Sequence, residues 1–171
     1  MEEHFIRTYI EKILEEIEGA EKAYNKILEP IQDIQDIDDT FRNIHYFVLH
    51  VSNIFKFIQP NSKELEFSKF RMKSLRIKYP HLPKIDHKSI LIRNDFEHYD
   101  ERIDSWIINS EAHNLADKNI GNVKSIDGLS STDYFRTYDP DTKILTFNHT
   151  EYSLKKLHLY TQQTKKAIIT K

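Results

Sequence analysis

Hydrophobic residues recur at helical intervals along much of the chain. A first apolar stripe lies between Glu3 and about Leu28 and consists of Phe5, Ile6, Tyr9, Ile10, Ile13, Leu14, Ile17 and Ala20. A second stripe, between about Asp39 and Ile58, consists of Phe41, Ile44, Phe47, Val48, Val51, Ile54, Phe55 and Ile58. Both spacings are those of one helix face, so the pattern predicts two long amphipathic helices. Pro30 separates them, and Asp38 or Asp39 is the expected N-cap of the second.

Three further helices follow from the same kind of pattern. The third is expected to begin near Ser62, which offers a cap, and to end at Tyr79-Pro80. The fourth spans roughly Ser89 to Ile108. The last spans about Glu151 to Ile169, and its buried side carries Leu154, Leu157, His158, Thr161 and Ile168.

The segment from Asn109 to Thr150 has a different pattern. Its first part is polar and rich in turn residues, which predicts a long surface loop. Its second part predicts a β-hairpin, with strands 135–138 and 144–147 on either side of an Asp139-Pro140-Asp141-Thr142 turn. The expected fold is therefore mainly α: an up-and-down bundle of about five helices in one domain, 1–171, with a small hairpin insertion before the last helix.

Composition narrows the class of protein. The chain has 39% hydrophobic and 30% charged residues, three glycines and no cysteine, which favours helices and excludes disulfide and thiolate chemistry. It has no apolar run long enough to cross a bilayer and no signal-like start, so we expect a cytoplasmic protein that does not contact a membrane. The net charge of −2 excludes a broadly basic nucleic-acid coat.

One segment is locally basic. Between Ser68 and Lys78 the chain carries Lys69, Arg71, Lys73, Arg76 and Lys78. A solvated helix face is the favoured interpretation of such a run, and a local nucleic-acid site is the alternative.

The predicted helix 89–108 carries an unusual polar face. On a helical wheel, its buried stripe consists of Ile92, Phe96, Tyr99, Ile103 and Trp106. The polar side chains then form one outward band made of Arg93, Asn94, Glu97, His98 and Glu101. Within this band, Arg93 is expected to reach Glu97, and Asn94 to reach His98. A solvated face with local ion pairs is the simplest explanation of this pattern.

The order Arg93-Asn94-x-x-x-His98 resembles the R-x(4–6)-H motif of the HEPN superfamily, in which Asn often follows the Arg. Proteins of that family are helical bundles that carry the motif near the start of a late helix. The longer string "RNDFEHYDERIDSW" is also similar to uncharacterised bacterial members. The resemblance covers roughly residues 3–108 and the last helix, so residues 109–150 count as an elaboration.

The resemblance implies a metal-independent endoribonuclease without cofactor, which cuts RNA through its own 2′-hydroxyl and acts as a homodimer through this helix. Arg93 would hold the scissile phosphate, His98 would transfer protons, and Asn94 would orient His98 or donate to phosphate. Two protomers would supply one histidine as base and one as acid. The supporting carboxylates Glu97 and Glu101 repel phosphate unless Arg93, Arg102 or the partner neutralises them.

Such enzymes include toxins and phage-defence effectors, and the implied partners besides RNA are an antitoxin or a regulatory protein. Toxins with the R-x4-H-x-Y pattern are modified on its Tyr, but position 100 is Asp here and Tyr99 lies on the buried stripe. Two alternatives stay open. One is a catalytically inactive HEPN-like module that binds RNA, a nucleotide or a protein partner. The other is a helical interaction module that uses the band as a polar interface.

The other histidines suggest no metal centre. None of His45, His50, His81, His87 and His149 has a recognised metal-ligand spacing. His158 is expected to be a satisfied histidine at the edge of the core.

Overall fold

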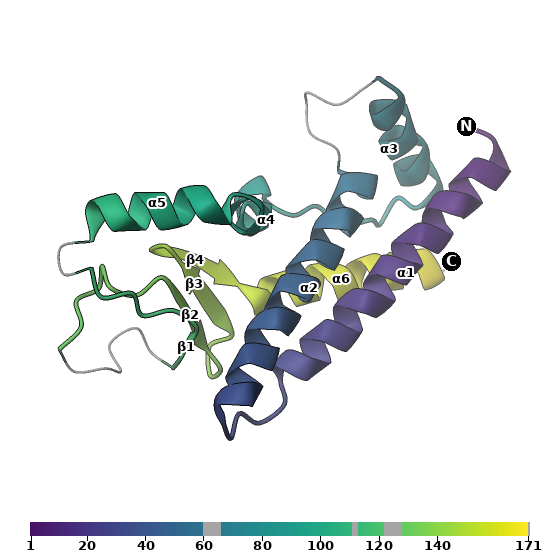
Figure 1. The fold of residues 1–171 in the computed structure, drawn as a ribbon. Helices are drawn as coiled ribbons and strands as arrows, with labels where there is room; N and C mark the ends of the chain where they lie inside the picture. Colours follow the sequence, from purple (N-terminus) through teal and green to yellow (C-terminus); the bar gives the residue numbers. More distant parts are fainter. Residues whose placement is uncertain (60–65, 111–112, 122–127, 171) are drawn as a thin grey trace.

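The computed structural model of the chain describes residues 1–59, 66–110, 113–121 and 128–170. The chain is mainly helical, and a small four-stranded sheet precedes the last helix, as the sequence predicts in outline (Figure 1). The elements are α1 (Glu3–Ile27), α2 (Ile34–Ile58), α3 (Glu66–Lys78), the 3-10 helix η1 (His87–Ile90), α4 (Ile92–Glu97), α5 (Tyr99–Asn109), β1 (Asn119–Ile120), β2 (Arg136–Asp139), β3 (Ile144–Phe147), β4 (Thr150–Ser153) and α6 (Leu154–Ile169).

Helices α1 and α2 form a long antiparallel pair (Figure 1). All eight residues predicted for the stripe of α2 are buried, as that pattern predicts. The stripe of α1 differs from the prediction at its start, because Phe5 is exposed, and it continues through Ala23, Tyr24 and Ile27. These two apolar faces supply much of the core, and burial of such side chains is the main stabilising contribution to folding.

Helix α2 begins at Ile34, five residues before the predicted start. Its N-cap is Asp33, whose carboxylate accepts hydrogen bonds from the backbone N–H groups of Gln35 (2.8 Å) and Asp36 (3.0 Å). The carboxylate of Asp36 accepts in turn from the N–H of Asp33, at 3.2 Å, which completes a capping box. The prediction of Asp38 or Asp39 as the N-cap is therefore wrong. The helix begins earlier, in an exposed first turn that carries no apolar stripe to mark it.

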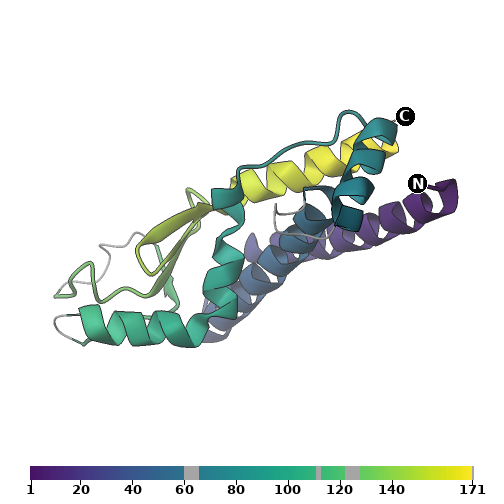
Figure 2. The ribbon, with the colours of Figure 1, turned by 90° about the horizontal axis from the view of Figure 1, so that it is seen from above.

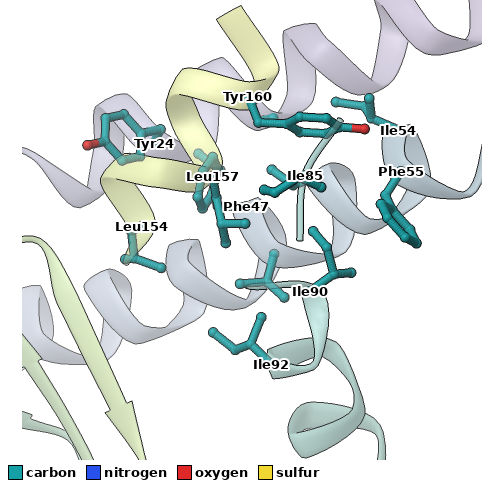
Figure 3. Packing of buried hydrophobic residues seen from close by; sticks show 14 of the residues in the cluster. Tyr24, Phe47, Ile54, Phe55, Ile85, Ile90, Ile92, Leu154, Leu157 and Tyr160 are labelled. Atoms are coloured by element: carbon teal, nitrogen blue, oxygen red, sulfur yellow. The ribbon is translucent and has the colours of Figure 1, made fainter. Parts of the chain in front are cut away.

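Helix α6 packs against α1 and α2. Figure 3 shows side chains of α6 meeting those of α1, α2 and residues 85–92 in one buried cluster that includes Tyr24, Phe47, Ile85, Leu157 and Tyr160. The helix begins three residues later than predicted because residues 150–153 form strand β4. Ser153 caps it by accepting a hydrogen bond from the N–H of Lys156, at 3.2 Å.

Helix α3 ends at Lys78, directly before Tyr79-Pro80, as predicted. Its predicted start near Ser62 lies outside the described residues. The basic side chains of this segment mostly hold the fold: Arg71 donates to backbone oxygens of Lys56 and Phe57, and Arg76 to those of Ile58, Leu82 and Pro83. Lys69 and Lys78 pair with Glu66 and Glu3. These contacts favour a structural role for the segment over a free anion-binding surface.

The sheet has the strand order β1-β2-β3-β4, with β1 parallel to β2 and the other pairs antiparallel. The predicted hairpin is confirmed as β2 and β3, with Tyr138 opposite Leu145. Strand β1 lies in the segment predicted to be loop, and β4 was not predicted. The turn between β3 and β4 consists of Asn148 (φ 42°) and His149 (φ 67°), the backbone signs of a type I′ hairpin turn.

The two ends of the molecule differ in content. The sheet and α5 lie at one end, and both chain termini and α3 lie at the other, as Figures 1 and 2 show from two directions. Among the helices of the described residues, none combines the length and hydrophobicity that crossing a membrane requires.

Candidate functional site at the α4–α5 bend

The predicted helix 89–108 is broken into three pieces. The chain forms η1, then α4, and then α5 after a break at His98, where φ is −108° and ψ is 42°. Helices α4 and α5 point in clearly different directions (Figures 1 and 2). The prediction of one straight helix is therefore wrong, and Arg93 and His98 belong to separate segments and not to one continuous helix face.

Asp95 holds the bend by a contact across it. Its carboxylate accepts hydrogen bonds from Arg102 Nε on α5, at 2.8 Å, and from Tyr152 Oη on β4, at 2.6 Å. Burial, followed by the bond to Asp95, raises the pKa of Tyr152 above its ordinary value, which keeps the hydroxyl protonated as a donor. Asp95 thus joins α4, α5 and the sheet.

Aromatic packing fixes the same bend from its buried side. Phe96 and Tyr99, on either side of the break, both contact the ring of Phe147, at centroid distances of 5.3 and 6.0 Å. Phe135 contacts Tyr99 and Phe147, and His45 stacks on Phe96 at 4.6 Å. The predicted inward stripe is thus present although the helix is broken, because the bend keeps both rings on the sheet.

Arg93 lies less exposed than the outward band predicts. Only 22% of its side chain is exposed, and its guanidinium pairs with Glu97 as the spacing of four residues predicts. Its Nε is enclosed and has no hydrogen-bond partner in the described part of the chain. An enclosed donor without an acceptor costs roughly 1–3 kcal/mol, so this guanidinium is not fully satisfied by the protein.

His98 faces outward, as predicted. Its side chain is 53% exposed, and Nδ1 lies 3.2 Å from Glu101 Oε1. The side chain of Asn94 is exposed, but among the described residues it forms no side-chain hydrogen bond with His98. The link between the two is instead the backbone hydrogen bond from the His98 N–H to the Asn94 carbonyl, at 2.9 Å. The predicted orientation of the imidazole by the Asn94 amide is thus not present.

Arg93 and Asn94 line a pocket between α2 and α4, which we call the α2–α4 pocket. Its volume is about 170 Å³, and its lining consists of Ser52, Phe55, Lys56, His87, Ile90, Leu91, Arg93 and Asn94. His98 is not among these residues. The structure therefore brings two of the three predicted catalytic residues together in the pocket and leaves the third, His98, outside its lining.

The lining of the α2–α4 pocket is cationic. It contains the permanent charges of Lys56 and Arg93 and the imidazole of His87, and it contains no carboxylate. The pocket between the end of α1 and the start of α2 differs, since Glu29, Asp36 and Asp39 line it. The lining of the α2–α4 pocket therefore favours an anion, although Glu97 offsets the charge of Arg93.

Sequence analysis missed the contribution of Lys56 and His87. Lys56 lies on the polar side of α2, more than thirty positions from Arg93, and no motif spacing connects the two residues. His87 was considered only as a metal ligand. Lys56 and His87 meet Arg93 only through the tertiary structure. Helix α4 packs on α2, which carries Lys56, and η1, which carries His87, precedes α4.

The supporting residues divide into two groups. Glu97 neutralises Arg93 and Glu101 contacts His98, so each carboxylate is next to one predicted catalytic group. Arg102 does not offset them through a direct contact, because its side chain pairs with Asp95. The positive charge of Arg102, which was expected to offset Glu97 and Glu101, is thus paired with Asp95.

Two other histidines, His158 and His50, take structural positions. The ring of His158 stacks on Tyr24, with the ring centroids 4.0 Å apart. Its Nδ1 is buried and has no hydrogen-bond partner among the described residues, which differs from the satisfied histidine that the sequence predicts. His50 pairs with Glu16 at 2.7 Å. Within the ranges described, no three His, Asp or Glu side chains are grouped so that they could hold a metal ion.

Comparison of the chain with protein-family models, with curated proteins and with solved structures found no match.

Proposed function

We propose that the protein is a metal-independent endoribonuclease of HEPN type that cleaves RNA through its 2′-hydroxyl, with Arg93, Asn94 and His98 as catalytic residues. The observation that carries the proposal is the surface around the α4–α5 bend. There Arg93 and Asn94 line a pocket, and the exposed imidazole of His98 follows four residues after Asn94, at the break between α4 and α5. Such a surface combines a phosphate-holding group with a proton-transferring group, the two requirements of this reaction.

The chemistry proceeds by proton transfer at two oxygens. An imidazole takes the proton of the 2′-hydroxyl, and the resulting oxygen attacks the neighbouring phosphorus. The bond from phosphorus to the 5′-oxygen breaks, and a protonated imidazole gives that oxygen its proton, which leaves a 2′,3′-cyclic phosphate and a 5′-hydroxyl. The guanidinium of Arg93 stabilises the charge that grows on the phosphate oxygens. RNA phosphate must displace Glu97 from Arg93 for this to happen.

We propose a homodimer through α4 and α5, since one protomer has a single His98 and the reaction needs both a base and an acid. Exposed apolar residues on α5 support this proposal. Ile107 is 50% exposed and Ile108 is 80% exposed, so α5 presents two apolar side chains that a second copy of the chain would cover. Helices α1, α2, α3 and α6 would then form the up-and-down bundle of one HEPN-like domain, with 109–150 as its elaboration.

A second function, that of a catalytically inactive module, is favoured by a different observation. Arg93 and His98 each contact a carboxylate, and the first turn of α5 adds the exposed Asp100. These negative charges repel RNA and would attract a basic segment of a protein partner. In this case the same surface recognises a regulatory protein, or an antitoxin, and cleaves nothing.

Cleavage of labelled RNA in the presence of a metal chelator distinguishes the two functions. We expect Arg93→Ala and His98→Ala each to lower the rate by about a hundredfold or more. The matched controls are Arg7→Ala and His4→Ala, because Arg7 pairs with Glu11 at the same spacing as Arg93 with Glu97, and His4 is an exposed histidine beside Glu2. Wild-type protein without cleavage, or cleavage that survives in both site variants, would refute the nuclease.

A further inference from the structure

The α2–α4 pocket has a feature that the proposed chemistry does not use. Besides Arg93 and Asn94, it is lined by Lys56 of α2 and His87 of η1. Neither side chain forms an ion pair with another described residue, whereas the guanidinium of Arg93 is held by Glu97. The pocket therefore contains two nitrogen groups that are available to a ligand.

We propose that the α2–α4 pocket binds a phosphate group, with Lys56 and Arg93 supplying charge and with His87 and Asn94 supplying N–H donors. This inference deepens the proposed function. That the phosphate belongs to RNA rests on the proposed nuclease activity. The ammonium group of Lys56 and the guanidinium of Arg93 are the side-chain groups that bind phosphate most strongly in proteins.

The other lining residues agree with this ligand. The hydroxyl of Ser52 donates to the carbonyl of Val48, at 2.7 Å, so it does not compete as a donor in the pocket. Phe55 and Ile90 are buried apolar residues, and an apolar wall reduces the screening of nearby charges.

The pocket also defines a role for Glu97. Because this carboxylate neutralises Arg93, it lowers the charge available to a bound phosphate. Glu97→Gln should release the guanidinium and tighten phosphate binding about twofold or more. A change of this sign is not expected from general damage to the fold.

Titration of the purified full chain with inorganic phosphate in a chloride buffer, followed by NMR or calorimetry, tests the inference without RNA. We expect saturable binding that is about tenfold weaker in Lys56→Gln and is also weakened in His87→Gln. The matched controls Lys155→Gln and His81→Gln alter exposed residues outside the pocket and should bind like wild type. Adenosine 3′-monophosphate, titrated in parallel, distinguishes a nucleotide from a free phosphate as the preferred source.

Two outcomes would overturn the inference: no saturable phosphate binding, or equal binding in wild type, Lys56→Gln and His87→Gln. RNA cleavage that is normal in Lys56→Gln and His87→Gln, with no phosphate binding, would remove the pocket and leave the proposed nuclease. Phosphate binding that follows the expected order in a protein that cleaves no RNA would support the pocket and remove the nuclease.

Discussion

At the scale of single residues, Asp95 joins more elements at the candidate site than any catalytic candidate does. Its carboxylate bonds to Arg102 and Tyr152 and spans the α4–α5 bend. Asp95→Ala should lower the free energy of unfolding by about 2–3 kcal/mol, because it leaves a phenol and a guanidinium without their acceptor. Urea unfolding measures this change. Asp104→Ala, at an exposed position on α5, is the control and should stay within about 0.5 kcal/mol of wild type.

His158 should make the stability depend on pH. Burial lowers its pKa below the ordinary value of 6.5, because the charged ring is poorly solvated beside Tyr24. The unfolded chain takes up a proton near that ordinary value while the folded chain does not, so stability is greatest above it and falls as the pH drops toward the lower folded value. Urea midpoints measured between about pH 7.5 and 5 should fall less in His158→Phe than in wild type. Equal slopes would contradict this assignment.

At the scale of elements, the sheet supports the bend through Phe147. This fully buried ring contacts Phe96, Tyr99 and Phe135. Phe147→Ala should cost about 3–5 kcal/mol, whereas Phe5→Ala, at an exposed position, should cost far less. Thermal or urea unfolding of both variants checks this difference. A small effect of Phe147→Ala would show that the sheet does not hold the bend.

An element could be predicted where the sequence itself carries its signal, such as apolar periodicity or turn residues. The periodic stripes placed α1, α2, α6 and the hairpin correctly in outline, because apolar spacing reports directly on burial. The start of α2 was missed because Ile34 opens the helix on its exposed side, where a capping box and not the stripe marks the beginning. The break at His98 has no Gly or Pro signal. It depends on contacts with Phe147 and Tyr152, which are distant in sequence.

The candidate site likewise combines local contacts that the sequence predicts with long-range contacts that it does not. The pairing of Arg93 with Glu97 follows from their spacing, and the structure contains it. The contribution of Lys56 and His87 could not be predicted, because it depends on how α4 packs on α2. The Arg102 contact was also unforeseen, since its partner Asp95 lies seven positions away, across a bend that helical periodicity does not report.

At the scale of the whole molecule, the proposed composite site requires two chains. Light scattering should give twice the chain mass of 20.5 kDa, and replacing both Ile107 and Ile108 by Ser should give a monomer with unchanged helix content. If the composite site is correct, this monomer should also lose RNA cleavage. A wild-type monomer at micromolar concentration would contradict the dimer and, with it, the paired histidines.

The most direct test of the central claim is cleavage of one RNA oligonucleotide, in chelator, compared with the same oligonucleotide carrying 2′-deoxyribose throughout. We predict that wild type cleaves the RNA and leaves a 2′,3′-cyclic phosphate, that the deoxy strand stays intact, and that Arg93→Ala and His98→Ala lose the activity. Cleavage of the deoxy strand at a similar rate, or product ends without the cyclic phosphate, would contradict it.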